Sequence, residues 1–154
     1  CENTLKDGIH ISRGSRFGII QGYNAIKNGD DCLAIVGNTR TTDSVRNITA
    51  TGCNLYNGGA RGCSVLGGED IYIEANIENP SSAGFYVGKE SNSAYDLRPP
   101  RRVTIKGRVK GAGLGYRAAL AATPKDGIFC FDYAEDVTFD VDVEDCVRRA
   151  AAKH

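Results

Sequence analysis

The sequence contains no methionine and no tryptophan, and only four of its 154 residues are proline. It also lacks any run of about 18 apolar residues, so nothing in it predicts a membrane-spanning helix. Net charge is missing as well, because lysine plus arginine and aspartate plus glutamate each number 19. Without an excess of either sign, no long-range field draws the chain to nucleic acid or to an anionic membrane surface. Any charged partner must be recognised locally.

Helical spacing of apolar residues is lacking too, whereas glycine is abundant, with 19 residues. Apolar residues instead hold every second position in short stretches, which is the pattern of a half-buried β-strand. The clearest stretches are 71–78, 103–110 and 137–144, and an earlier copy with a one-residue irregularity spans 48–57. The chain is therefore predicted to be nearly all β.

A second, shorter strand follows each long one. These short strands read DGIHI from Asp7, DDCLAI from Asp30, RGCSVL from Arg61, AGFYV from Ala83 and DGIFCF from Asp126. Strands that recur in phase at roughly 20 to 35 residues, with no helices between them, predict a right-handed parallel β-helix. A sandwich or a closed barrel would need hairpin turns, against which the in-phase copies argue. We expect residues 1–154 to be one partial β-helix domain of about five coils, a fragment of a longer solenoid, with loops at 89–101 and 111–125.

The charge pattern supports this register. Three basic residues in 103–110 fall opposite acidic residues of 137–144 and opposite acidic or amide residues of 71–78. Opposite charges across neighbouring strands stabilise modestly, so this is a paired outer face rather than a nucleic-acid patch. The turns place Asn28, Asn57 and Asn79 at one position of successive copies, where asparagines are expected to stack.

Stacking the short strands puts five residues in one column: Asp7, Asp31, Arg61, Ala83 and Asp126. Asp30 lies beside Asp31 in the turn before the strand. Neighbouring carboxylates repel one another, which raises the pKa of at least one and leaves another ionised. This is the arrangement that an acid and a base need for glycoside hydrolysis. The alternative is an Asn-Gly-Asp-Asp turn that serves turn formation alone.

The segments DGIHIS at 7–12 and GDDCLAI at 29–35 resemble the central motifs of the polygalacturonase family of glycoside hydrolases. These pectinases belong to the pectin-lyase-like β-helix superfamily, which includes tailspike depolymerases of bacteriophages. The resemblance implies a single-displacement, inverting hydrolase of an acidic or complex polysaccharide such as pectin or a bacterial surface glycan. Asp30 would be the general acid, and Asp7 and Asp31 would activate the water. No metal or organic cofactor is required.

The resemblance also implies a location and a partner. The protein would be extracellular and secreted, or part of a virion surface if phage-encoded, and a phage tailspike would be a homotrimer. The partner is the polysaccharide substrate, with no nucleic acid and no membrane insertion.

Two family motifs are altered, which makes other residues candidates for substrate binding. Arg61 stands where the family has the histidine of Gly-His-Gly, and Tyr86 stands where it has the arginine of Arg-Ile-Lys, with Lys89 nearby. Arg61 and Lys89 are expected to meet an acidic sugar. His10 and Tyr86 share a column with Ala34, Ser64 and Phe129 that would floor the cleft.

The six cysteines show no paired zinc-ligand spacing and permit disulfides in an oxidising compartment. Strand alternation places Cys63 and Cys130 on the core side and Cys32 on the opposite side. The resemblance implies a disulfide between Cys32 and Cys53 that would brace the Asp30–Asp31 turn.

Two other functions fit the same sequence. One is a non-catalytic β-helix that binds glycan or serves as a stalk, in which the aspartates only shape a turn. The other is a polysaccharide lyase of the same fold, which would leave an unsaturated product instead of a hydrolysed one.

Overall fold

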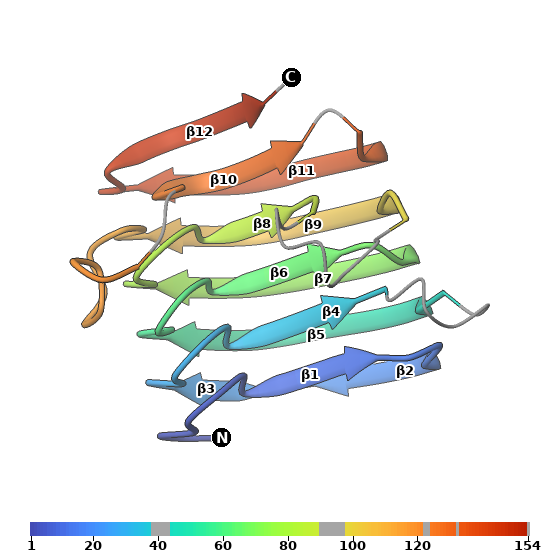
Figure 1. Ribbon diagram of the computed structural model, residues 1–154, viewed down its shortest axis with the longest axis horizontal. Helices are drawn as coiled ribbons and strands as arrows, with labels where there is room; N and C mark the ends of the chain where they lie inside the picture. The colour runs from blue at the N-terminus through green and yellow to red at the C-terminus, as the bar shows by residue number, and fades with distance from the viewer. Residues whose placement is uncertain (38–43, 90–97, 122–123, 132, 154) are drawn as a thin grey trace.

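A computed structural model of the chain shows two parallel β-sheets that lie face to face (Figure 1). It describes residues 1–37, 44–89, 98–121, 124–131 and 133–153, and of residues 149–153 only the backbone. These parts contain twelve strands and no helix, and hence no helix that could cross a membrane. The predicted loop at 89–101 lies mostly outside the described residues, as does a small part of the loop at 111–125.

One sheet consists of the short strands in the order β1-β4-β6-β8-β10-β12. Their bounds are Ile9–Ser12, Leu33–Val36, Cys63–Leu66, Phe85–Val87, Asp126–Phe131 and Arg148–Lys153. The other sheet has the order β11-β9-β7-β5-β2, and β3 also pairs with β5. Its strands, in chain order from β2, span Arg16–Gln21, Asn24–Ile26, Arg46–Tyr56, Glu69–Glu78, Arg101–Lys110 and Glu135–Glu144.

The two sheets bury their facing surfaces in one core. In β7, the side chains alternate between buried and more exposed along the strand, as a period-2 pattern requires. Ile71, Ile73 and Ile77 point inward from it and are at most 2% exposed. They belong to the same apolar cluster as Leu33 and Val65 of the facing sheet. Burial between the sheets therefore fixes which face of each strand carries the polar residues.

The predicted registers of both sheets are confirmed. Lys106 pairs with Glu74 on one side and with Asp140 on the other, and Val103 pairs with Ile71 and Val137. In the short-strand sheet, Ile9 pairs with Leu33, Leu33 with Cys63, and so on to Ile128. Residues at the same offset before each short strand therefore lie side by side.

Residues with a left-handed backbone occupy the second position of the long strands and the position just after they end. At the start, the φ angles of Phe17, Asn47, Asp70, Arg102 and Asp136 lie between 51° and 58°. At the end, Lys27, Asn57, Asn79, Gly111 and Asp145 have φ between 49° and 68°. Asparagine, aspartate and glycine tolerate this conformation best, and they hold most of these positions.

The predicted asparagine stack is wrong by one residue. Lys27, not Asn28, shares the end position with Asn57 and Asn79, because Ile26 pairs with Tyr56 and Tyr56 with Glu78. The turn after β3 has one residue, Lys27, before its asparagine, whereas Asn57 and Asn79 directly follow β5 and β7. An asparagine ladder exists nearby on the exposed face of the long-strand sheet. There, Asn54 donates to Asn24 at 3.0 Å, and Asn76 donates to Asn54 at 3.3 Å.

The predicted irregularity in 48–57 is a β-bulge. The register between β5 and β7 shifts between Ala50 and Cys53, where Gly52 has φ +60°. The preceding copy has the same extra residue, Gly22, with φ +63°, between β2 and β3. Since Gln21 pairs with Thr51 and Asn24 with Asn54, the two glycines are neighbours and the two bulges coincide.

This arrangement corrects the predicted fold class. The sequence predicts a right-handed parallel β-helix, whereas the strands lie in two separate parallel sheets, neither of which closes on itself. We therefore describe the fold as an all-β sandwich of two open parallel sheets. Among the described strands, each link between neighbours of one sheet passes through the other sheet, so the sandwich needs no hairpins. The alternation of apolar and polar residues predicts which residues are buried, and the sequence repeats predict which strands are neighbours. They do not report how the sheets join.

Candidate functional site

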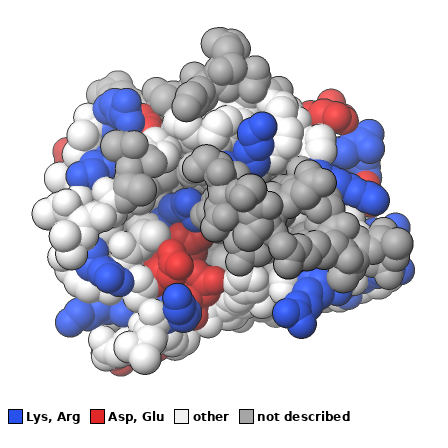
Figure 2. Space-filling model, in the orientation of Figure 1, with Lys and Arg blue, Asp and Glu red and all other residues white. Residues whose placement is uncertain are grey.

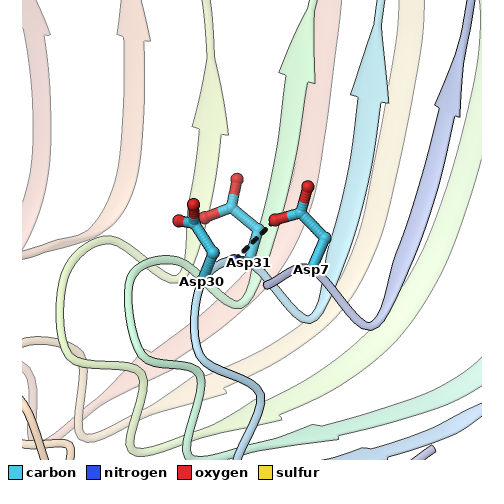
Figure 3. A group of neighbouring side chains, drawn as sticks. All are labelled: Asp7, Asp30 and Asp31. Atoms are coloured by element: carbon cyan, nitrogen blue, oxygen red, sulfur yellow. Dashed lines mark hydrogen bonds between the residues drawn. The ribbon is translucent and has the colours of Figure 1, made fainter. Parts of the chain in front are cut away.

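The carboxylates of the predicted site come from two neighbouring turns. Asp7 lies two residues before β1, and Asp31 lies two residues before β4, which pairs with β1. Asp30 precedes Asp31 in the same turn. Figure 3 shows the three side chains close together and projecting to the same side of the ribbon. The parallel register thus brings together residues that lie more than 20 positions apart in the chain.

Asp7 is held by a donor at each carboxylate oxygen. Its Oδ1 accepts the backbone N–H of Asp31 at 3.0 Å, the bond drawn in Figure 3. Its Oδ2 lies 2.6 Å from Nδ1 of His10, which is half-exposed. The first bond ties the two turns together. The second places an imidazole next to the carboxylate.

Asp31 is almost completely buried, at 3% exposure. Its Oδ1 accepts the backbone N–H of Arg61 at 2.9 Å, and its Oδ2 accepts from Nη1 of Arg61 at 3.2 Å and from the Ser64 hydroxyl at 2.6 Å. Burial raises the pKa of Asp31 above its ordinary value, and the Arg61 guanidinium and the Ser64 hydroxyl offset part of that rise. The repulsion expected between the aspartates contributes little, since Asp7 is the smallest cause of the shift.

Asp30 is the most accessible of the three carboxylates. Its backbone is fixed on both sides, because its N–H donates to the carbonyl of Lys6 at 3.3 Å and its carbonyl accepts from Ala60 at 3.1 Å. One carboxylate oxygen from each of Asp7, Asp30 and Asp31 lies within 4.8 Å of the others. The site therefore combines a rigid backbone with carboxylates of graded exposure.

The carboxylates line a pocket with a volume of about 120 Å³. Figure 2 shows acidic atoms gathered in a hollow of this face, with basic atoms beside them. The pocket is lined by Asp7, His10, Asp30, Asp31, Ala34, Val36, Arg61 and Leu66. One side of the pocket is polar and can donate and accept protons. The other side is apolar and is formed by the outer faces of β4 and β6.

Three carboxylate oxygens at this spacing are the kind of donor set that hard cations accept. However, Asp31 already accepts three hydrogen bonds, two of them from Arg61, whose positive charge would repel a second cation. The aspartates are therefore better placed to exchange protons than to hold a metal ion.

Of the predicted substrate-binding residues, His10 and Arg61 line the pocket, whereas Tyr86 and Lys89 do not. Tyr86 is 5% exposed, and its ring supports the Arg61 guanidinium from 4.3 Å. It also stacks on Phe129 at 5.3 Å between ring centroids. The predicted column of residues is confirmed, but its two aromatic side chains, Tyr86 and Phe129, pack against each other. Lys89 lies with its Nζ 5.0 Å from the Tyr133 ring.

The predicted disulfide is not present, because Cys32 and Cys53 are both free and buried. Cys32 belongs to the core cluster, so the expectation that it faces away from the core is also wrong. Strand alternation does not extend to this residue, which lies in the turn just before β4. Cys63 is buried in the core as predicted, and Cys130 packs against it.

Sequence reasoning missed two sets of contacts. Ser64 was expected in the His10 column, but its hydrogen bond to Asp31 was not foreseen. The segment after β9 also reaches the acidic turn. The Tyr116 hydroxyl donates to the carbonyl of Asn28 at 3.1 Å, and Arg117 donates from Nη1 to the carbonyl of Gly29 at 2.7 Å. These partners are 88 positions apart, and no local pattern announces such a contact.

A scan against protein-family models and searches of curated proteins and of solved structures gave no match for this chain. What can be said of its function therefore rests on the site itself and on the motifs that form it.

Proposed function

We propose that the chain hydrolyses glycosidic bonds of a polysaccharide at the Asp7–Asp30–Asp31 site. The observation that supports this most is the meeting of three carboxylates, from two turns, at the edge of one pocket. Glycoside hydrolysis needs a carboxylic acid to protonate the leaving oxygen and a second group to activate water. The resemblance of the two turns to polygalacturonase motifs assigns the same residues to that chemistry.

The different exposure of the aspartates suggests how the roles divide. Asp30 is the most accessible and is the general acid that protonates the glycosidic oxygen. Asp31 is buried and engaged at both oxygens, so it supports the site rather than reaching the substrate. Water activation then falls to the Asp7 side of the pocket, where the side chains are more exposed.

The displacement that we propose is single and inverting, as in the resembling family. Inverting enzymes typically keep their two carboxyl groups roughly 6.5–9.5 Å apart, which leaves room for the water. The nearest oxygens of the three aspartates lie within 4.8 Å, which is closer than that range suggests. The anomer that is released first decides between inversion and retention, and nuclear magnetic resonance of a fresh digest measures it directly.

The substrate that we propose is an acidic or complex glycan, such as pectin or a bacterial surface polysaccharide. Arg61 lines the pocket beside the aspartates and is paired with Asp31, so an acidic sugar would add a second carboxylate to the guanidinium. An enzyme of this kind acts outside the cell that makes it or on a virion surface, and a phage enzyme would assemble as a homotrimer.

A second candidate, a glycan-binding protein without catalysis, is favoured by the contacts of Asp31. Its bonds to Arg61 and Ser64 tie the neighbouring strands β4 and β6 together, which is a purely structural use of a carboxylate. In such a protein, Asp30 would only shape the turn.

The test is reducing-end release from polygalacturonate and from a panel of capsular and lipopolysaccharide glycans, with Asp30→Asn as the matched variant. We expect one glycan to be cut and the variant to be inactive. Retention of a glycan without cleavage would support the binding protein. An unsaturated product that absorbs in the ultraviolet would identify a lyase.

A further inference from the structure

His10 is the one imidazole in the described part of the chain, and it lies in the acidic pocket. Its Nδ1 is 2.6 Å from Oδ2 of Asp7. A carboxylate only accepts hydrogen bonds, so Nδ1 must be the nitrogen that carries the proton. In the neutral ring, Nε2 is then left with a free lone pair.

The two side chains of this pair differ in exposure in a way that suits a relay. The Asp7 side chain is 17% exposed, and the His10 side chain is 46% exposed. Oδ1 of Asp7 is also tied to the backbone of Asp31, which fixes the carboxylate in place. Asp7 thus orients the ring, while the ring is the group that solvent reaches.

We infer that His10, oriented by Asp7, is the general base that activates the attacking water. The inference rests on the proposed hydrolysis and changes one role in it, because Asp7 acts through the imidazole rather than directly on water. Nε2 lies on the side of the ring away from Asp7. The attacking water would therefore be held farther from the Asp7 carboxylate than if Asp7 itself were the base.

The surroundings of His10 favour a transient positive charge on the ring. The carboxylates of Asp30 and Asp31 line the same pocket, and Asp7 precedes His10 by three residues, just before β1. The opposing cation, Arg61, is paired with Asp31 at 3.2 Å. A nearby carboxylate stabilises an imidazolium as it forms, as in other aspartate–histidine pairs.

Hydrolysis would then proceed as a single displacement. Nε2 takes a proton from water while the water oxygen bonds to the anomeric carbon. The bond from that carbon to the glycosidic oxygen breaks, and the oxygen takes the proton of Asp30. The products are two sugar chains, an imidazolium and a carboxylate. One proton passing from His10 to Asp30 through solvent restores the starting state.

The first test does not need a substrate. The chain has two histidines, His10 and His154, so a His154→Gln variant assigns the imidazole ¹⁵N signals. At a pH where the ring is neutral, we expect His10 to be the Nδ1–H tautomer and to lose that preference in Asp7→Asn. A His10 ring that is the Nε2–H tautomer would overturn the inference without touching the proposed hydrolysis.

The second test uses a glycan that the native protein cuts. General acid–base catalysis contributes about 10²- to 10⁴-fold, so His10→Gln should lower kcat by that factor with little change in KM. The His154→Gln protein should keep its activity. If His10→Gln keeps full activity while Asp30→Asn loses it, hydrolysis stands and the role of His10 is refuted. If no glycan of the panel is cut, the proposed hydrolysis fails and the role of His10 falls with it.

Discussion

Arg61 and Asp31 lie 30 positions apart, yet Arg61 donates to both carboxylate oxygens of Asp31, once from its backbone and once from its guanidinium. Their side chains are 17% and 4% exposed, so this is a largely buried ion pair. Removing one partner of a buried pair leaves the other charge without compensation, which costs more than the pair itself is worth.

Arg61→Met should therefore destabilise the protein by about 3 kcal/mol. Urea unfolding measures the change. The matched control is Arg102→Met, because Arg102 also pairs with an aspartate, Asp70, but both side chains are more than 40% exposed. That variant should change stability little. Equal losses in the two variants would mean that Asp31 is not buried in solution.

The pH dependence of stability should depend on Asp31. Burial raises its pKa in the folded protein, so the folded state holds the proton more tightly than the unfolded state does. The associated stability is present below the ordinary aspartate pKa of about 4 and is lost as the pH rises through the folded pKa. Asp31→Asn should therefore flatten the fall in stability above about pH 4, whereas Asp140→Asn on the exposed face should not. Unfolding curves at a series of pH values would decide this.

Arg117 should restrain the acidic turn from a distance. Its side chain donates to the carbonyl of Gly29, next to Asp30. A hydrogen bond of this kind is worth about 1 kcal/mol. Arg117→Met should therefore speed exchange of the Gly29 amide several-fold while leaving the unfolding midpoint nearly unchanged. The control is Arg13→Met, at the other end of β1, which should leave the exchange rate of the Gly29 amide unchanged. If Arg117→Met also leaves that rate unchanged, the contact is absent in solution.

Thiol labelling should separate Cys1 from the core cysteines. Cys1 is exposed, whereas Cys32, Cys53 and Cys63 are buried. Burial raises the pKa of Cys32 to about 12, so its thiolate is scarce at neutral pH. In the native protein Cys1 should react with iodoacetamide well before these three, which should react only after unfolding. Mass spectrometry of the reacted peptides identifies each site. A Cys32–Cys53 disulfide would block both residues even in denaturant.

Much of the site could be predicted because, in parallel strands, one known residue pair determines which of the other residues are neighbours. Once Ile9, Leu33 and Cys63 are known to be in register, the residues two positions earlier, Asp7, Asp31 and Arg61, must be neighbours. Period-2 alternation likewise predicted which side of each long strand is buried.

Other features depend on contacts that no local pattern encodes. The chain alternates apolar and polar residues whether its strands wind as a β-helix or form two open sheets, so the fold class was missed. The hydrogen bond from Arg117 to Gly29 spans 88 positions and comes from a segment without regular structure. The exposure of Tyr86 was overestimated, because alternation says that a residue points outward and not what then covers it.

The paired bulges at Gly22 and Gly52 have a consequence for how such a chain can change length. A single deletion of Gly52 would put β5 in step with β7 but out of step with β2 and β3. Loss of both glycines would keep all these strands in step. A change of length in a long strand should therefore disturb the pairing least when the neighbouring copies change together. The register shift between β5 and β7 shows how the fold joins a copy with the extra residue to one without it.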